Sequence, residues 1–156
     1  MVKTIKIIYD KYENDIGFSY LPENEINKDH IHNIIENINS EPLVLDRTLK
    51  IYTWGVKKHT CNECDIIFDA TLFRANINVD VKTLTGFDEI VQTSIMNHPL
   101  FDTILERIIT TIEEENPKVI GFICNYGKHR SVGWAELLHK LYYTNSTLKH
   151  IGLQLI

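Results

Sequence analysis

Residues 119–132 read VIGFICNYGKHRSV, and this stretch decides the fold. An apolar run from Val119 to Cys124 is typical of a buried strand, and a helical pattern begins at Val132. The seven residues between them carry three basic side chains and a glycine. A buried strand followed closely by a helix is the repeating unit of α/β folds. The stretch therefore predicts an α/β fold with a mainly parallel sheet, flanking helices and a phosphate-binding loop at the strand-to-helix junction.

The rest of the chain continues this alternation. β-branched and apolar runs predict further strands at residues 4–9, 49–56, 65–70 and 148–156. Apolar residues at helical spacing predict helices at 26–38, 87–95, 99–115 and 132–143. The run at 65–70 is nearly all apolar, which favours a central strand. Residues 71–86 lack clean periodicity and predict a long ordered loop, and such loops are often functional.

Length and composition limit the possible classes of protein. A chain of 156 residues fits one domain, here 1–156, in which 1–48 form an N-terminal subregion of open relation to 49–156. A net charge of −5 argues against binding nucleic acid over the whole surface. The chain has no apolar stretch of the ~20 residues that a membrane span needs, and its charged start is unlike a signal peptide. We therefore expect a soluble cytoplasmic protein that does not associate with membranes.

The junction after Cys124 is the candidate site. In open α/β sheets ligands bind at the carboxyl ends of the strands, and the free N–H groups and dipole of a following helix favour an anion. Gly127 permits a turn that gathers N–H groups, and Arg130 offers a planar fork for two phosphate oxygens. The candidate ligand-binding residues here are Asn125, Tyr126, Gly127, Lys128, His129, Arg130 and Ser131. The alternative is a solvated turn in which Ser131 caps the helix.

The spacing of Cys124, Gly127, Arg130 and Ser131 is C-x-x-G-x-x-R-S, which resembles the phosphate loop of cysteine-dependent phosphatases. That resemblance implies a thiolate nucleophile at Cys124, with the loop N–H groups and Arg130 holding the phosphate oxygens. Such an enzyme needs an acid to protonate the leaving group, and the candidates are Asp69 and Asp88. Alternatively, Cys124 is simply the last buried residue of its strand. Whether the protein is an enzyme stays open.

A wider resemblance covers several blocks of sequence in one order. NYGKHRSV, preceded by GFIC and followed by the pair Ala135 and Glu136, is similar to a CTGG-K-HRSV stretch in the C-terminal domain of the RNase adapter protein RapZ. Upstream, the matching blocks are TWGVK at 53–57, Phe68 with Asp69, and LTGFD at 84–88. The resemblance implies a sensor and adapter domain that binds an amino-sugar phosphate such as glucosamine 6-phosphate, associates with RNA and forms homo-oligomers.

The identity of the phosphorylated ligand stays open at this point. Tyr126 can stack on a base or on a sugar face, so a nucleotide and a phosphosugar have equal weight. Candidate contacts outside the junction lie in the long loop after Asp69, at Arg74, Asn76 and Lys82, which could equally be solvated. Asp69 can accept sugar hydroxyls, act as an acid or cap its own loop. We expect no cofactor.

One cysteine cluster lies outside the site. His59, Cys61 and Cys64 form H-x-C-x-x-C, which offers three zinc ligands where a closed structural site needs four. A fourth ligand, His98 or His150, would have to come from elsewhere in the fold. Three cysteines, two of them close together, do not indicate a disulfide framework. We therefore expect a plain connection between two strands and no metal.

Overall fold

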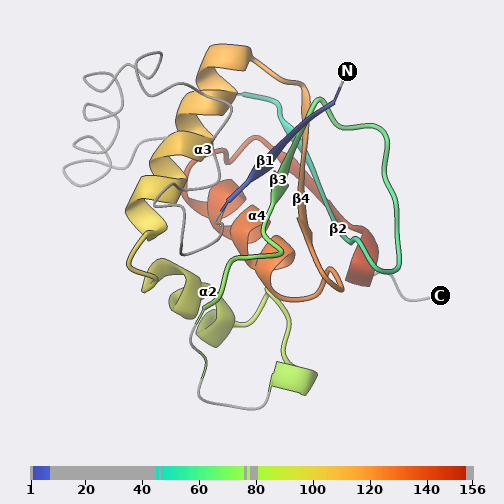
Figure 1. The fold of residues 1–156 in the computed structure, drawn as a ribbon. Helices are drawn as coiled ribbons and strands as arrows, with labels where there is room; N and C mark the ends of the chain where they lie inside the picture. The colour runs from blue at the N-terminus through green and yellow to red at the C-terminus, as the bar shows by residue number, and fades with distance from the viewer. Residues whose placement is uncertain (1, 8–44, 46, 76, 78–80, 154–156) are drawn as a thin grey trace.

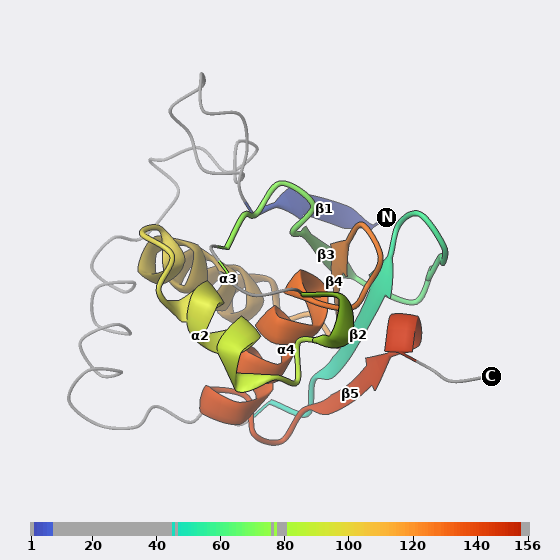
Figure 2. The same ribbon diagram turned by 90° about the horizontal axis from the view of Figure 1, so that it is seen from below.

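The sheet of the described residues is parallel throughout and has five strands in the order β1-β3-β4-β2-β5. Figure 1 shows β1, β3, β4 and β2 side by side, and Figure 2 shows β5 next to β2. The computed structural model describes residues 2–7, 45, 47–75, 77 and 81–153, and all statements below concern these residues. The strands are β1 (Lys3–Lys6), β2 (Lys50–Gly55), β3 (Ile66–Asp69), β4 (Val119–Cys124) and β5 (Thr147–His150). β1, from the start of the chain, pairs with β3 and so joins the same sheet.

The described residues form three α-helices, α2 (Glu89–Met96), α3 (Phe101–Glu115) and α4 (Arg130–Leu141). Two short 3-10 turns accompany them, η2 (Val81–Thr83) and η3 (Ile151–Leu153). Figure 2 shows all three α-helices on one face of the sheet. The prediction of an α/β fold with a mainly parallel sheet is confirmed. None of the described helices has the length and apolarity that crossing a membrane would require.

The core lies between the sheet and these helices. Phe68 and Phe122 are register partners on β3 and β4, and their stacked ring centroids lie 5.3 Å apart. Trp134 of α4 has no exposed surface and packs against Phe73 and Phe101. A smaller cluster of Trp54, Ile123 and Cys64 occupies the other face. Because both faces around β4 are covered, its sequence is a continuous apolar run rather than an alternating one.

The strands predicted at 49–56 and 65–70 are one residue longer at each end than β2 and β3, and the first and last predicted strands also run past the observed ones. The strand predicted at 148–156 ends at His150, and η3 replaces its continuation. A Cβ on Gly152 would lie 2.6 Å from the carbonyl oxygen of Gly127, so η3 turns the chain closely against the β4–α4 loop. The strand predicted at 4–9 ends at Lys6, although Ile7 still donates to the carbonyl of Asp69 at 2.8 Å. Residues 8, 9 and 154–156 of the predicted strands, and the helix predicted at 26–38, lie outside the described residues.

The predicted helices differ from the observed ones mainly at their ends. α4 begins at Arg130, two residues before the predicted start, and ends at Leu141. Arg130 and Ser131 therefore belong to the first turn of a helix. α3 begins at Phe101, after Pro99, and ends at Glu115; its C-cap is Asn116, whose backbone is left-handed with φ 53°. Asparagine tolerates this conformation better than most residues, and Pro117 then prevents the helix from continuing.

Candidate anion-binding site at the β4–α4 junction

The junction after β4 lies at the edge of the sheet where the carboxyl ends of all five parallel strands meet. Backbone hydrogen bonds tie it to its neighbours on both sides. Val56 and Lys57 donate to the carbonyls of Cys124 and Asn125 at 3.0 and 3.1 Å, which extends the β2–β4 pairing beyond the strands. On the other side, Ala70 donates to the carbonyl of Ile123 at 2.8 Å. The loop is thus fixed by the ends of β2 and β3.

Two glycines allow this close approach. Gly127 has φ 73°, a left-handed conformation that is costly for other residues. A Cβ on Gly127 would lie 2.5 Å from the backbone nitrogen of Gly55, and a Cβ on Gly55 would lie 2.2 Å from the carbonyl carbon of Tyr126. Because neither position has room for a side chain, the end of β2 and the loop pack backbone against backbone.

Cys124 lies at the base of the loop, where hydrogen-bond donors surround its sulfur. It is 2% exposed, and its Sγ lies 3.2 Å from the hydroxyl of Ser131. Burial by itself raises the pKa of this thiol, but the Ser131 hydroxyl, the backbone N–H groups of Ser131 and Gly127, and the charge of Arg130 together lower it below its ordinary value. These donors stabilise negative charge at this point.

The alternative that Ser131 caps the helix is wrong. The N-cap residue of α4 is His129, which makes no side-chain capping hydrogen bond. Ser131 is fully buried, and its hydroxyl contacts the sulfur of Cys124. The hydroxyl of Ser131 therefore forms its contact at the base of the loop, with Cys124.

Arg130 reaches across to the loop after β3. Its Nη1 donates to the carbonyls of Ala70, Thr71 and Phe73 at 3.3, 2.7 and 3.1 Å. Within the described part of the chain, these are the hydrogen bonds that its guanidinium makes, so Nε and Nη2 are not engaged there. One edge of the planar group is thus anchored, which fixes the orientation of the rest.

The surroundings of Arg130 bring several predicted residues together. Burial lowers its pKa, the negative charges of Cys124 and Asp69 act in the opposite direction, and the positive charge of Arg74 adds to the lowering. Arg74 is exposed and lies close enough for its charge to affect Arg130. The guanidinium groups of Arg74, in the loop after β3, and Arg130, in the first turn of α4, create a positive potential that an anion would relieve.

The two carboxylates considered as acids both bind backbone N–H groups of their own loops. Asp69 accepts from the N–H of Thr71 at 2.9 Å, which is the loop-capping alternative considered for this residue. Asp88 accepts from the N–H of Thr85 at 2.7 Å and precedes α2. Each carboxylate still has a second oxygen, so these contacts describe the position of the two groups and do not assign a reaction to them.

The exposed side of the loop carries an aromatic ring and basic groups. Tyr126 is 50% exposed, and the Nζ atoms of Lys57 and Lys58 lie 5.4 and 5.9 Å from its ring centroid. Lys128 is exposed, and Asn125 and His129 are partly buried. Of the contacts predicted in the long loop, Lys82 lies exposed in η2, and Asn76 is outside the described residues.

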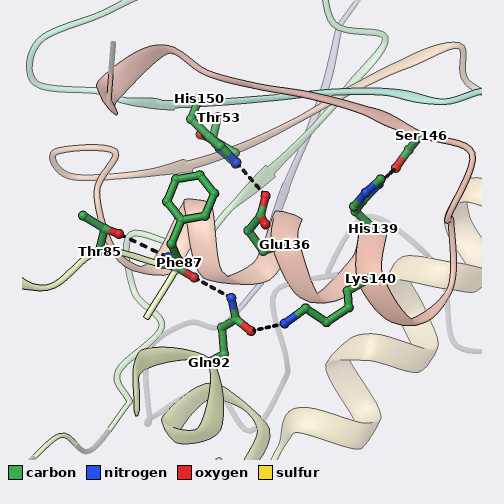
Figure 3. A network of polar contacts seen from close by, with 10 residues as sticks. Thr53, Thr85, Phe87, Gln92, Glu136, His139, Lys140, Ser146 and His150 are labelled. Carbon is green, nitrogen blue, oxygen red and sulfur yellow. Dashed lines mark hydrogen bonds and ion pairs between the residues drawn. The ribbon is translucent and has the colours of Figure 1, made fainter. Parts of the chain in front are cut away.

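A network of polar contacts joins α4 to β2, β5 and α2 (Figure 3). His150 at the end of β5 bonds Thr53 of β2 at 2.7 Å and Glu136 of α4 at 2.9 Å, with the Phe87 ring edge-on at 5.1 Å. These contacts join β2, β5 and α4. The pair Ala135 and Glu136 was part of the sequence resemblance, but the partners of Glu136 could not be seen from it.

The loop at residues 84–88 is tied to the junction through its glycine. Gly86 donates to the carbonyl of Lys128 at 2.7 Å and accepts from the side-chain amide of Gln92 at 2.8 Å. Lys140 donates to the amide oxygen of Gln92 at 3.0 Å (Figure 3). A Cβ on Gly86 would lie 2.2 Å from the nitrogen of Gly133, so this loop packs directly on α4. Sequence reasoning missed the roles of Gln92 and Lys140, for which the sequence has no local signal.

The cysteine cluster lies beneath the opposite face of the sheet. Cys64 is 3% exposed beside Trp54, and its pKa is raised by burial first and by the neighbouring Cys61 second. All three cysteines are free thiols. Among the described residues, no three metal-binding side chains are grouped closely enough to hold an ion.

The fold and the junction define an α/β domain with a basic loop at the start of a helix, a class that binds anionic ligands at the carboxyl edge of its sheet. Comparison with known families identifies its particular relatives. The family model described as the RapZ C-terminal domain matches residues 47–153, which is more than half of the chain. The chain therefore belongs to the RapZ C-terminal domain family, and the resemblance seen in the sequence is confirmed.

Individual relatives share about 30% of their residues or fewer with the matched part of this chain. A protein of Alkaliphilus oremlandii (strain OhILAs) is 30% identical over 123 residues, which cover 72% of this chain and 41% of the relative. A protein of Listeria monocytogenes serotype 4a is 27% identical over 118 residues, 67% of this chain and 40% of the relative. Both are named nucleotide-binding protein. The chain thus spans about two fifths of the length of these relatives.

Proposed function

We propose that this chain binds a phosphorylated small molecule, a phosphosugar or a nucleotide, at the β4–α4 junction and acts as a sensor domain. One phosphate group occupies the concave side of the loop. The proposed ligand-binding residues are Asn125, Tyr126, Gly127, Lys128, His129, Arg130, Ser131 and Arg74. Membership of the RapZ C-terminal domain family supports this proposal in general terms.

The observation that carries the proposal is the anchoring of Arg130 through one nitrogen. Three carbonyl oxygens hold Nη1, while Nε and Nη2 make no hydrogen bond within the described residues. A guanidinium that is held at one edge presents its other edge in a fixed orientation. That geometry suits two phosphate oxygens, which arginine binds through parallel N–H groups.

The local charge supports the same ligand. The chain as a whole carries −5, yet Arg74, Lys128 and Arg130 gather at this edge of the sheet. The first turn of α4 contains no acidic residue that would compete with an incoming anion. The positive end of the helix dipole therefore adds to the side-chain charges.

The remainder of the ligand has two candidate chemistries. The half-exposed ring of Tyr126 can stack on a nucleobase, and the two relatives carry the name nucleotide-binding protein. The sequence resemblance implies a phosphosugar such as glucosamine 6-phosphate, whose sugar face can also pack on a tyrosine. Isothermal titration calorimetry with glucosamine 6-phosphate and with AMP separates the two. Failure of both, and of inorganic phosphate, to bind would contradict the proposal.

The second candidate function is phosphoryl transfer by Cys124, which its lowered pKa and surrounding N–H groups favour. In that reaction the thiolate sulfur bonds to phosphorus, the ester bond breaks, and Asp69 or Asp88 protonates the departing alcohol. Water then hydrolyses the phosphocysteine to release phosphate. An aryl phosphate tests it: turnover that Cys124→Ser abolishes supports this enzyme, and no turnover alongside ligand binding supports the sensor.

RNA association and self-association stay predictions. If the domain acts as an RNA adapter, structured RNA should be retained on the immobilised protein at low salt and released as the salt concentration rises. Light scattering coupled to size exclusion measures the oligomeric state directly. A monomer that does not retain RNA would restrict the function to binding the small ligand.

A further inference from the structure

A second cluster of positive charge lies beside the loop at Lys57 and Lys58. Both residues lie in the turn that follows β2, after Val56, and both are exposed. Their ammonium groups lie 5.4 and 5.9 Å from the centroid of the Tyr126 ring. Tyr126 itself belongs to the loop that holds the proposed phosphate. The two lysines therefore stand next to the first anion site rather than elsewhere on the surface.

The backbone fixes these lysines in place. The N–H of Lys57 donates to the carbonyl of Asn125 at 3.1 Å, which joins it to the loop. Lys58 and His59 both donate to the carbonyl of Gly55, at 3.1 and 2.9 Å, and so close a tight turn. The backbone of this turn is therefore already ordered, so less conformational entropy is lost when the two lysines bind a ligand.

Among the described residues, no carboxylate balances the charge of the two lysines. Within the described part of the chain, neither lysine forms an ion pair with a carboxylate, and the contact of each is with the Tyr126 ring. A cation–π contact at an exposed site stabilises only weakly. Two adjacent ammonium groups repel each other, and a bound anion would remove that repulsion.

We propose that Lys57, Lys58 and Tyr126 form a second subsite, which takes a second phosphate group of the ligand. This proposal rests on the proposed function, because it places the first phosphate at the β4–α4 loop. The ligand is then a bis-phosphorylated small molecule, either a nucleoside diphosphate or a sugar bisphosphate. Tyr126 stands between the two anion positions and contacts the part of the ligand that joins them.

The experiment measures dissociation constants by isothermal titration at fixed ionic strength. The probes are inorganic phosphate, pyrophosphate, AMP with ADP, and fructose 6-phosphate with fructose 1,6-bisphosphate. We expect at least one diphosphate or bisphosphate to bind at least tenfold more tightly than its monophosphate. The pair in which the gain occurs identifies the source of the second phosphate.

The variant Lys57→Ala/Lys58→Ala should lose this gain and keep the affinity for inorganic phosphate. The matched control is Lys50→Ala/Lys118→Ala, which removes the same charge from exposed lysines at the start of β2 and just before β4, at the opposite edge of the sheet. The control should keep the gain. Thermal melting of both variants checks that each is folded.

The outcomes separate this inference from the proposed function. If inorganic phosphate binds but no bis-phosphorylated probe binds more tightly, or if the gain survives in Lys57→Ala/Lys58→Ala, the second subsite is overturned and the first site stands. If the gain falls equally in both double variants, it arises from net charge, and the subsite is again overturned. If no probe binds the wild type, the proposed function fails as well.

Discussion

The guanidinium of Arg130 donates through Nη1 to the carbonyl oxygen of Thr71 at 2.7 Å, which ties the first turn of α4 to the loop after β3. The two residues are 59 positions apart in the chain. This bond and its two neighbours orient the arginine before any ligand arrives. Preorganised donors bind an anion without the cost of ordering them at that moment.

The variant Arg130→Lys should bind phosphate more weakly while the protein stays folded. Lysine keeps the charge but cannot hold backbone carbonyls and present a second edge to the ligand at the same time. Loss of charge-assisted hydrogen bonds of about 1.5–3 kcal/mol corresponds to about 10-fold to 100-fold weaker binding. Titration calorimetry with inorganic phosphate measures this loss of affinity, and Lys118→Ala is the control. Unchanged affinity in Arg130→Lys would contradict the role of Arg130.

Replacing Gly127 with alanine should destabilise the fold and disturb the loop. The position has φ 73°, and the new Cβ would meet the backbone of Gly55 at 2.5 Å. The conformational strain alone costs about 1–2 kcal/mol, and the contact with rigid backbone adds to it. Urea denaturation followed by circular dichroism measures the loss in free energy of unfolding.

The control is Gly133→Ala in α4, where the new Cβ also meets an atom at 2.5 Å, but that atom is the end of the Ile95 side chain. A flexible side chain can move away, and alanine favours a helix interior over glycine by about 1 kcal/mol. Gly133→Ala should therefore cost clearly less than Gly127→Ala. Equal losses would show that the backbone contact between Gly127 and Gly55 is not critical.

Cys124 should make the stability of the protein depend on pH. Its pKa in the folded protein is lower than its ordinary value, and an unfolded cysteine titrates at about 8.5. A group with a depressed pKa contributes stability that is fully present above the unfolded value and is lost as pH falls through the folded value. The difference in free energy of unfolding between wild type and Cys124→Ala should rise with pH up to about 8.5 and then level off.

Denaturation curves at several values from pH 6 to pH 9 provide this measurement. Cys64→Ala is an informative comparison because burial raises the pKa of Cys64. The difference in free energy of unfolding between wild type and Cys64→Ala should therefore fall as pH rises in the alkaline range. A wild-type advantage over Cys124→Ala that shrinks as pH rises would indicate that burial outweighs the donors around the sulfur.

Glu113 should be important for stability, since it is shared by two partners. It accepts from the hydroxyl of Tyr143 at 2.9 Å and pairs with Nε of Arg47 at 2.6 Å. Tyr143 is fully buried, so Glu113→Ala would leave its hydroxyl unsatisfied at a cost of about 1–3 kcal/mol. Tyr143→Phe removes the hydroxyl itself and should cost less. In the double variant the two losses should not add, and full additivity in urea denaturation would argue against this contact.

The sequence was sufficient for β4 and for the fold class. The run from Val119 to Cys124 is apolar on both faces and ends sharply at polar residues, so its limits are those of the observed strand. The start of α4 was placed too late because Arg130 and Ser131 are polar. The reason Ser131 is nevertheless buried is its contact with Cys124, seven positions earlier. Apolar periodicity cannot detect such a polar contact.

Other features depend on contacts between distant segments. β5 was predicted to run on through Gly152, but there the chain turns against the carbonyl of Gly127. The carbonyls that hold Arg130 are backbone groups, which every residue has, so no residue type in the sequence indicates them. Glu136 meets His150 only because α4 crosses the end of β5. The sequence thus indicated the residues of the junction, while their partners required the structure.

Binding of a phosphate group by the β4–α4 loop and Arg130 can be followed residue by residue in solution. The most direct measurement is a titration of the ¹⁵N-labelled protein with inorganic phosphate, followed through its backbone amide resonances. We expect saturable shifts that concentrate on residues 125–131 and disappear in Arg130→Ala. Shifts spread evenly over the surface, or a loop that does not respond at millimolar phosphate, would contradict it.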